Sequence, residues 1–155
     1  MSKVYSFITV QIIPCSLEKA WDFFSNPANL AEITPKELKF TTFSKYHGEK
    51  MYPGQIIEYK VHPVLGIPLY WMTEITHVKH HKYFVDEQRY GPYSLWHHQH
   101  HFKETAGGTE MTDIVHYKLP FWFFGDIANT LMVRKQLKGI FDFRCRVVER
   151  MFEKQ

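Results

Sequence analysis

The sequence predicts an α+β domain in which a curved antiparallel sheet of about seven strands wraps around one long C-terminal helix. Three patterns predict it: a first strand followed at once by two short helices, strand patterns through 38–119, and one helical pattern over about 127–153. Strands that follow one another without alternating helices pair antiparallel, because parallel strands need long crossover connections. A helix of roughly 27 residues is about 40 Å long, so it must lie across the sheet.

The N-terminal elements have clear start and stop signals. Residues 4–13 are β-branched and aromatic, and Pro14 ends this first strand. Ser16 offers an N-cap to a short helix with apolar residues at helical spacing, namely Leu17, Ala20, Trp21 and Phe24. Asn26-Pro27 predicts a second helix with proline at its first position, ending before Pro35. Its apolar residues are Leu30 and Ile33.

Residues 38–119 read as strands separated by turns. The predicted strands are 38–43, 55–61, 69–77, the two strands within 84–102, and 109–119. Alternation assigns an inward face to three of them: Ile57, Tyr59 and Val61; Leu69, Trp71, Thr73 and Ile75; and Met111, Asp113, Val115 and Tyr117.

The C-terminal helix is expected to begin at an Asp126 cap. Its apolar stripe is predicted as Ile127, Leu131, Phe141, Val148 and Phe152. Its polar positions are predicted as Arg134, Lys135, Arg144, Arg146, Glu149 and Arg150. The aromatic segment 120–125 before the helix is either a plug beneath it or an exposed lip at a cavity mouth.

Length and composition limit the protein class. The 155 residues are most simply one domain, 1–155, with 45% hydrophobic residues for a packed core. The net charge of +3 is too small and too dispersed to predict nucleic-acid binding. Cys15 and Cys145 have no metal-binding spacing and are expected to be unpaired, buried small hydrophobes. Without a signal-peptide pattern or a membrane-length apolar run, we expect a cytoplasmic monomer or weak homodimer that contacts membranes at most transiently.

The stretch from Phe84 to Phe102 carries the most informative pattern, two strands joined by a Gly91-Pro92 turn. One alternating set is mostly polar and is expected to face water: Val85, Glu87, Arg89, Leu95, His97, Gln99 and His101. The other set surrounds two imidazoles, a carboxylate and an amide with aromatic rings: Phe84, Asp86, Gln88, Trp96, His98, His100 and Phe102. This mixture is typical of a pocket lining and unusual for a plain core.

Turn lengths predict the strand register around these residues. A loop at 91–93 and a two-residue turn at 106–107 give these opposite pairs: Asp86–His98, Phe84–His100, His100–Asp113 and Trp96–Tyr117. Cross-strand Cβ atoms lie about 4.5–5.5 Å apart, close enough for hydrogen bonds between side chains. We therefore expect contacts of Asp86 with His98 and of Asp113 with His100.

The element order and several segments resemble the helix-grip (SRPBCC-type) superfamily, which includes START-related lipid-transfer domains, pollen-allergen-like proteins and aromatic polyketide cyclases. The chain looks most like the bacterial branch of cyclase/dehydrase-like or ligand-binding proteins. The segments that carry the resemblance are Ala20–Leu30, Ile33–Pro35, Gly66–Pro68 with Trp71, Phe84–Phe102 and Asp113–Tyr117. The resemblance implies the helix-grip fold over essentially the whole chain. It does not select one function, because the superfamily holds carriers, receptors, chaperone activators and enzymes.

Three functions stay open. The first is binding of a small, largely hydrophobic molecule between the sheet and the C-terminal helix, with these lining residues: Tyr59, Trp71, Thr73, Phe84, Asp86, Gln88, Trp96, His98, His100, Phe102, Asp113 and Tyr117. The second is a cyclase or dehydratase that uses an Asp–His pair, with Asp86, His98, His100 and Asp113 as catalytic candidates. The third is a non-catalytic interaction module, with a vestigial cavity and a satisfied buried polar network.

The two histidines also raise the possibility of metal binding. His98 and His100 share one strand face and could bind an ion together with a carboxylate. Each carboxylate could equally be the partner that fixes an imidazole tautomer. We therefore expect no tightly bound transition metal and no other cofactor.

Overall fold

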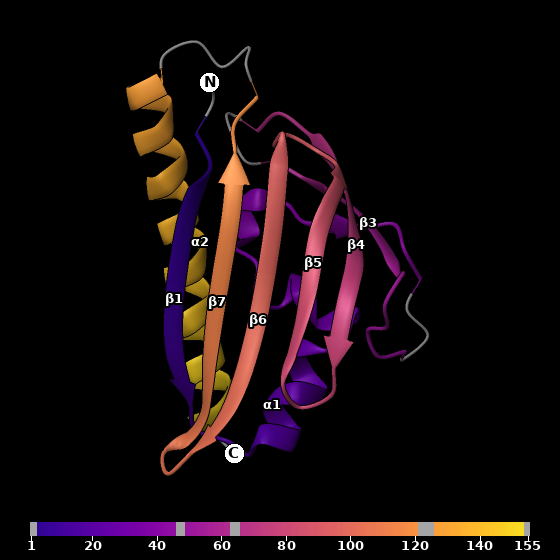
Figure 1. The fold of residues 1–155 in the computed structure, drawn as a ribbon, viewed down its shortest axis with the longest axis vertical. Coiled ribbons are helices and arrows are strands. Elements are labelled where there is room, and N and C mark those ends of the chain that lie inside the picture. The colour runs from indigo at the N-terminus through magenta and orange to yellow at the C-terminus, as the bar shows by residue number, and fades with distance from the viewer. Residues whose placement is uncertain (1–2, 46–48, 63–65, 121–125, 154–155) are drawn as a thin grey trace.

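The computed structural model describes residues 3–45, 49–62, 66–120 and 126–153. The elements, in order, are β1 (Tyr5–Ile13), α1 (Leu17–Phe24), the 3₁₀-helices η1 (Pro27–Ala31) and η2 (Lys36–Leu38), β2 (Thr41–Thr42), β3 (Ile56–Val61), β4 (Leu69–Lys79), β5 (Tyr83–Tyr90), β6 (Leu95–Thr105), β7 (Gly108–Lys118) and α2 (Asp126–Glu153). The strands form one antiparallel sheet in the order β1-β7-β6-β5-β4-β3-β2 (Figure 1). The predicted α+β architecture is confirmed.

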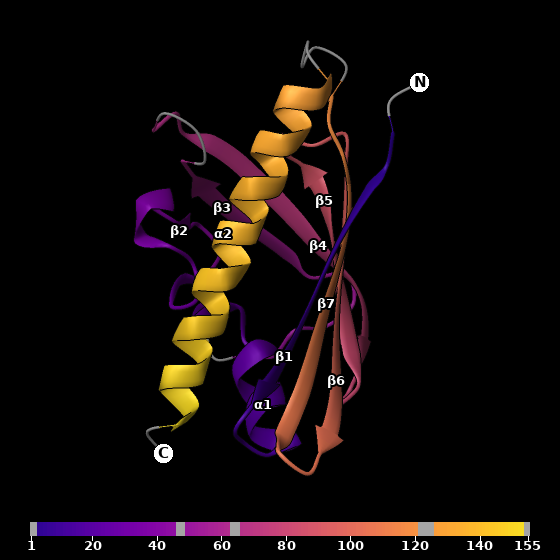
Figure 2. The same cartoon turned by 90° about the vertical axis from the view of Figure 1, so that its left-hand side faces the viewer.

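The helices lie on one face of the curved sheet. α2 runs along this face, and α1 lies between the sheet and the C-terminal part of α2 (Figure 2). The Gln11 side-chain amide donates a hydrogen bond to the Cys145 carbonyl over 2.7 Å, which ties the edge strand β1 to α2. The space that these elements enclose contains the polar residues of β5, β6 and β7.

The N-terminal signals act as predicted, with one correction. Ser16 Oγ accepts a hydrogen bond from the Lys19 amide and caps α1. Asn26 caps the second helix, but η1 is a 3₁₀-helix that ends at Ala31, before Ile33. The segment is bounded by two prolines, and Pro35 disfavours a helical residue before it, so a regular α-helix has no room.

The prediction of a strand over 38–43 is wrong for most of these residues. Leu38 ends η2, Lys39 adopts a left-handed conformation with φ 43°, and only Thr41–Thr42 pair with β3. The left-handed residue breaks the extended conformation that a strand requires. The other predicted strands are present, with the inward faces that alternation gave them.

The apolar stripe of α2 differs from the prediction at its N-terminal half. Leu131 is 63% exposed, while Val133 and Leu137 are buried. At about 100° per residue, Leu137 and Val133 lie about 40° and 80° to one side of Phe141 around the helix, whereas Leu131 lies about 80° to the other side, away from the buried residues. The buried positions Phe141, Val148 and Phe152 are as predicted. The Ile127 side chain and the aromatic segment 121–125 lie outside the described residues.

Two single-residue expectations also need correction. Val85 was expected to face water but is 7% exposed, because its cross-strand neighbours His77 and Gln99 flank it on that face. Cys15 and Cys145 are unpaired, as expected, but both are half-buried, not buried.

The core has two parts. One gathers around α1 and the end of α2: Ile13, Ala20, Trp21, Phe24, Ile33, Phe84, Phe102, Met111, Val148 and Phe152. The other lies under the middle of α2: Val115, Tyr117, Val133, Leu137 and Phe141. Along β6 and β7 the polar residues of the candidate site fall between these two apolar clusters.

Candidate functional site

Three adjacent strands bring two carboxylates and two imidazoles together. Asp86 on β5 pairs with His98 on β6, and His100 pairs with Asp113 on β7. Phe84–His100 and Trp96–Tyr117 are also directly opposite, so the predicted register is confirmed at all four positions. His98, His100 and Asp113 are only 4%, 6% and 5% exposed, which makes this a buried polar cluster.

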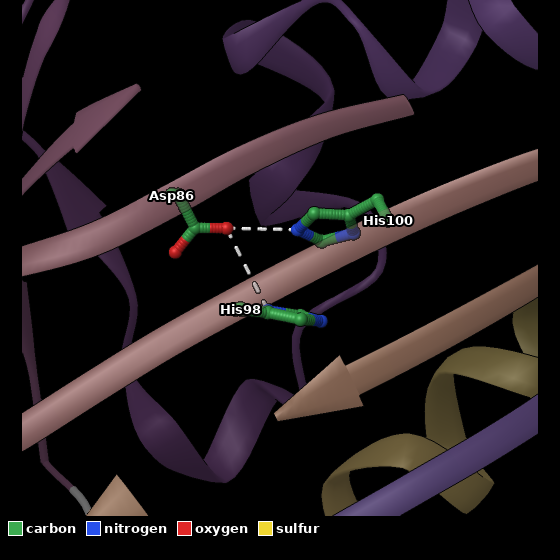
Figure 3. A group of neighbouring side chains, drawn as sticks. All are labelled: Asp86, His98 and His100. Carbon is green, nitrogen blue, oxygen red and sulfur yellow. Dashed lines mark hydrogen bonds and ion pairs between the residues drawn. The ribbon is translucent and has the colours of Figure 1, made fainter. Parts of the chain in front are cut away.

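The hydrogen bonds in the cluster run diagonally between strands. His98 Nε2 donates to Asp113 Oδ1 over 2.9 Å, and His100 Nε2 donates to Asp86 Oδ2 over 2.8 Å. The directly opposite contacts also exist: His98 Nδ1 lies 3.6 Å from Asp86 Oδ2, and His100 Nδ1 lies 2.9 Å from Asp113 Oδ1. Neither has the geometry of a hydrogen bond. Each imidazole therefore lies between the same two carboxylates, and Figure 3 shows both rings beside Asp86.

These contacts fix the charges of the cluster. Burial alone would raise the pKa of Asp113, but the contacts with His100 and His98 hold it well below its usual range. Burial likewise opposes ionisation of Asp86, yet the hydrogen bond from His100 leads the effects that lower its pKa. Both side chains are therefore carboxylates at neutral pH.

The two imidazoles are driven in opposite directions. Burial disfavours a charge on His100, but its contacts with Asp113 and Asp86 raise its pKa. Burial, reinforced by the neighbouring His100, lowers the pKa of His98. A bare lone pair on His100 Nδ1 would face a carboxylate oxygen at 2.9 Å, which independently favours a proton on that nitrogen. We assign His100 as an imidazolium and His98 as a neutral imidazole.

Aromatic packing holds both rings in place. The His100 ring stacks on Phe84 at 4.1 Å between centroids, and the His98 ring stacks on His100 at 3.7 Å. Trp96 and Phe141 contact His98 edge-to-face, at 6.1 and 5.6 Å. The imidazoles therefore have little freedom to turn.

This arrangement is a poor match for a metal centre. Asp86, His98 and His100 do offer ligand atoms within 4.8 Å of one another. An imidazole binds an ion through a lone pair in its ring plane, at about 2.0–2.1 Å. The nitrogens that face Asp86 are His98 Nδ1 and His100 Nε2, and His100 Nε2 carries the proton that it donates to Asp86 Oδ2, so it offers no lone pair to an ion. The residues form a hydrogen-bonded network, not a preformed coordination site.

A cavity of about 180 Å³ adjoins the cluster. An engineered cavity of about 150 Å³ is known to hold benzene, so this space accepts a compact molecule of about one or two rings. Apolar and aromatic side chains make most of its wall. They come from η1, β3, β4, β6, α2 and the segments that follow η1 and η2, and include Leu30, Ile33, Phe40, Ile57, Trp71, Trp96, Leu137 and Phe141. Its polar wall includes Asp86, His98 and His100. Small-molecule sites commonly combine an apolar wall with a few polar groups in this way.

The predicted lining residues divide into two groups. Those in the cavity wall are Tyr59, Trp71, Thr73, Phe84, Asp86, Trp96, His98 and His100. The others are Gln88, Phe102, Asp113 and Tyr117. Gln88 uses its side-chain amide to bind both backbone groups of Tyr93, at 2.6 and 3.2 Å. Phe102 and Tyr117 belong to the two core clusters.

Sequence reasoning missed Arg144. It was assigned to the polar positions of the C-terminal helix, yet its side chain is 11% exposed and belongs to the cavity wall. Its Nη1 lies 3.7 Å from Asp113 Oδ1, and its Cζ lies 4.9 Å from the centre of the Phe141 ring. The available signal was its spacing, three residues after Phe141 and four before Val148, which places it within the buried stripe.

Among the helices that the structure describes, none combines the length and the apolar character needed to cross a membrane.

Comparison with known proteins identifies the fold only. No protein-family model matches the sequence. No curated protein matches it either. Similar solved structures include an uncharacterised protein of Rhizobium leguminosarum, 13% identical, with a TM-score of 0.69 over 97% of both chains. The ginseng major latex-like protein 151 of Panax ginseng is 12% identical, with a TM-score of 0.69 over 96% of this chain and 97% of its own.

The di-domain ARO/CYC protein StfQ of the steffimycin biosynthetic pathway is also similar. It is 11% identical, with a TM-score of 0.73 over 97% of this chain and 52% of its own. The chain thus has the helix-grip fold that its sequence predicted, and identities this low support no statement beyond the fold.

Proposed function

We propose that this protein binds a small, largely hydrophobic molecule in the cavity between the sheet and α2. The cavity itself is the main support, because an apolar wall beside a buried polar cluster suits a ligand with an apolar body and one polar end. The fold adds support: one similar structure belongs to a latex-like protein and another to an ARO/CYC protein. In this proposal residues 1–155 work as one domain in the cytoplasm.

The test uses the uncharged two-ring fluorophore 1-aminonaphthalene. We expect it to bind the purified protein with a blue-shifted emission, as a dye does in an apolar site. Ile140 lies in the cavity wall, so Ile140→Trp narrows the cavity and should abolish the blue-shifted emission of the dye. Met132→Trp is the matched control, because Met132 is 43% exposed on the same helix and is not in the wall. Equal emission from both variants would place the dye elsewhere and remove the support for this cavity.

A cyclase or dehydratase acting in the same cavity is the second candidate. It is favoured by the opposite protonation of His98 and His100, since paired groups with divergent pKa values suit base and acid roles. Here neutral His98 would remove a proton next to a carbonyl group, and His100 would protonate the departing oxygen. Proton exchange in benzoylacetone, followed by NMR in deuterium oxide, tests the first step. It should be lost in His98→Asn and kept in His97→Asn, whose ring faces outward.

A non-catalytic interaction module is the third candidate, and the weak homodimer expected from the sequence belongs here. The edge strand β1 carries exposed apolar side chains, with Ile8 60% and Val10 59% exposed. Such an edge is suited to antiparallel pairing with the same strand of a second copy. Sedimentation should then show a concentration-dependent dimer that Val10→Lys dissociates. A strictly monomeric protein at high concentration would exclude it.

A further inference from the structure

Among the residues that the structure describes, the Arg144 guanidinium has a hydrogen-bond donor without a partner. A guanidinium has five N–H donors and no acceptor. Within the described part of the chain, the Arg144 Nε is buried without a partner. The contact of Nη1 with Asp113 is 3.7 Å long, beyond hydrogen-bond distance. Buried polar groups are normally hydrogen-bonded, so a buried guanidinium in this state indicates a missing partner.

The neighbouring carboxylates do not supply that partner in the structure, because their contacts are with the imidazoles. Asp113 Oδ1 already accepts the hydrogen bond from His98 and faces His100 Nδ1. Asp86 Oδ2 accepts from His100. With His100 charged, the two carboxylates are balanced by His100 and Arg144 together. The charge of Arg144 is thus compensated at a distance, while its Nε has no hydrogen-bond partner among the described residues and its side chain lies in the cavity wall.

We propose that the ligand is an amphipathic carboxylic acid whose carboxylate accepts two parallel hydrogen bonds from Arg144. The planar guanidinium fork matches a carboxylate in this bidentate arrangement. The apolar body of the acid then lies against Trp71 and Trp96, which contact each other edge-to-face at 5.3 Å in the same wall. The cavity of about 180 Å³ limits this body to a compact aromatic or branched group. This inference rests on the proposed ligand-binding function and names its substrate class.

The test compares an acid with its uncharged isostere. 2-Naphthoic acid and 2-naphthamide have the same skeleton, and each is titrated against bound 1-aminonaphthalene. We expect the acid to displace the dye at about ten- to a hundred-fold lower concentration, as charge-assisted hydrogen bonds predict. The preference should disappear in Arg144→Met and fall partly in Arg144→Lys, which keeps the charge but loses the fork. Arg146→Met is the matched control, because Arg146 is exposed on the same helix and should leave the preference unchanged.

A second measurement uses the unmodified protein, so that the test survives if Arg144→Met does not fold. The side-chain ¹H–¹⁵N signal of Arg144 Nε should shift when the acid is added and stay in place with the amide. Equal displacement by acid and amide, with an unmoved Arg144 signal, would overturn the carboxylate inference and leave hydrophobic ligand binding standing. Failure of the dye and of both naphthalene compounds to bind would overturn the two proposals together.

Discussion

Replacing Asp113 with asparagine should destabilise the protein substantially, because Asp113 keeps the polar cluster in place from the side away from the cavity. Asp113→Asn preserves the shape but removes the negative charge that faces His98 and His100, each at 2.9 Å. A hydrogen bond to a charged group contributes about 1.5–3 kcal/mol against about 0.5–1.5 kcal/mol for a neutral one. Weakening the hydrogen bond from His98 and removing the ion contact with His100 should together lower the free energy of unfolding by about 2–3 kcal/mol. In a chain of this size the melting temperature falls by about 5–10 °C.

Thermal and urea unfolding at pH 7 measure this effect. Asp142→Asn is the control, since Asp142 is half exposed on α2 and pairs with Lys138 as a surface i,i+4 salt bridge. Such a pair contributes about 0.3–0.5 kcal/mol, so the control should melt close to the wild type. The lowered pKa of Asp113 adds a pH signature: its contribution is present above about pH 4 and is lost as the pH falls through the folded pKa. Equal melting of Asp113→Asn and Asp142→Asn at pH 7 would refute the reasoning.

Three further predictions concern the cluster and the backbone. The stability contributed by His98 is complete above about pH 6.5 and is lost as the pH falls, because its folded pKa is lowered. The stability contributed by His100 is complete below about pH 6.5 and is lost as the pH rises, because its folded pKa is raised. The free energy of unfolding in urea should therefore be highest near about pH 6.5, and its decline at alkaline pH should be absent in His100→Asn. Elemental analysis should find less than stoichiometric zinc and iron. A full equivalent that His98→Ala removes would contradict the assignment of a proton to His100 Nε2. Gly108→Ala should lower the free energy of unfolding by about 2 kcal/mol or more, because Gly108 has a φ of 124° and the new Cβ collides with the Ile13 carbonyl oxygen. Gly139→Ala, at a position in α2 where the new Cβ meets open space, should raise the free energy of unfolding by about 0.5–1 kcal/mol in the same assay.

The alternation of inward and outward side chains predicted the sheet well, because side chains in a strand point to opposite faces in turn and one face of this sheet is buried. A shift of one residue along β6 would have turned His98 and His100 to the solvent and His97 to the interior. The turn at 106–107 fixed the β6–β7 register, and the pairing of His100 with Asp113 followed from it. The short elements were harder, since 27–43 depends on two prolines and a left-handed Lys39 that no periodicity reveals.

The site was predicted in part for a similar reason. Residues on neighbouring strands are related by register, so Asp86, His98 and Asp113 could be placed together from the sequence. The packing of α2 on the sheet has no such rule, because it depends on how the helix is turned about its axis. Arg144 was therefore misplaced, although its position in the buried stripe was available. Strand alternation placed Gln88 in the cavity wall, but its side-chain amide instead forms hydrogen bonds with the nearby backbone of Tyr93.

The two carboxylates have different surroundings, and this difference bears on whether the cluster is structural or functional. Asp113 is absent from the cavity wall, so its role is to hold the imidazoles. Asp86 is in the wall with a side chain 16% exposed, and only one of its oxygens contacts the imidazoles. A network that Asp113 holds on the protein side, and that includes Asp86 on the cavity side, can stabilise the sheet and still contact a ligand. Asp113→Asn should therefore mainly lower the free energy of unfolding, whereas Asp86→Asn should mainly weaken ligand binding. The two substitutions thus separate the structural role of the cluster from its role in binding.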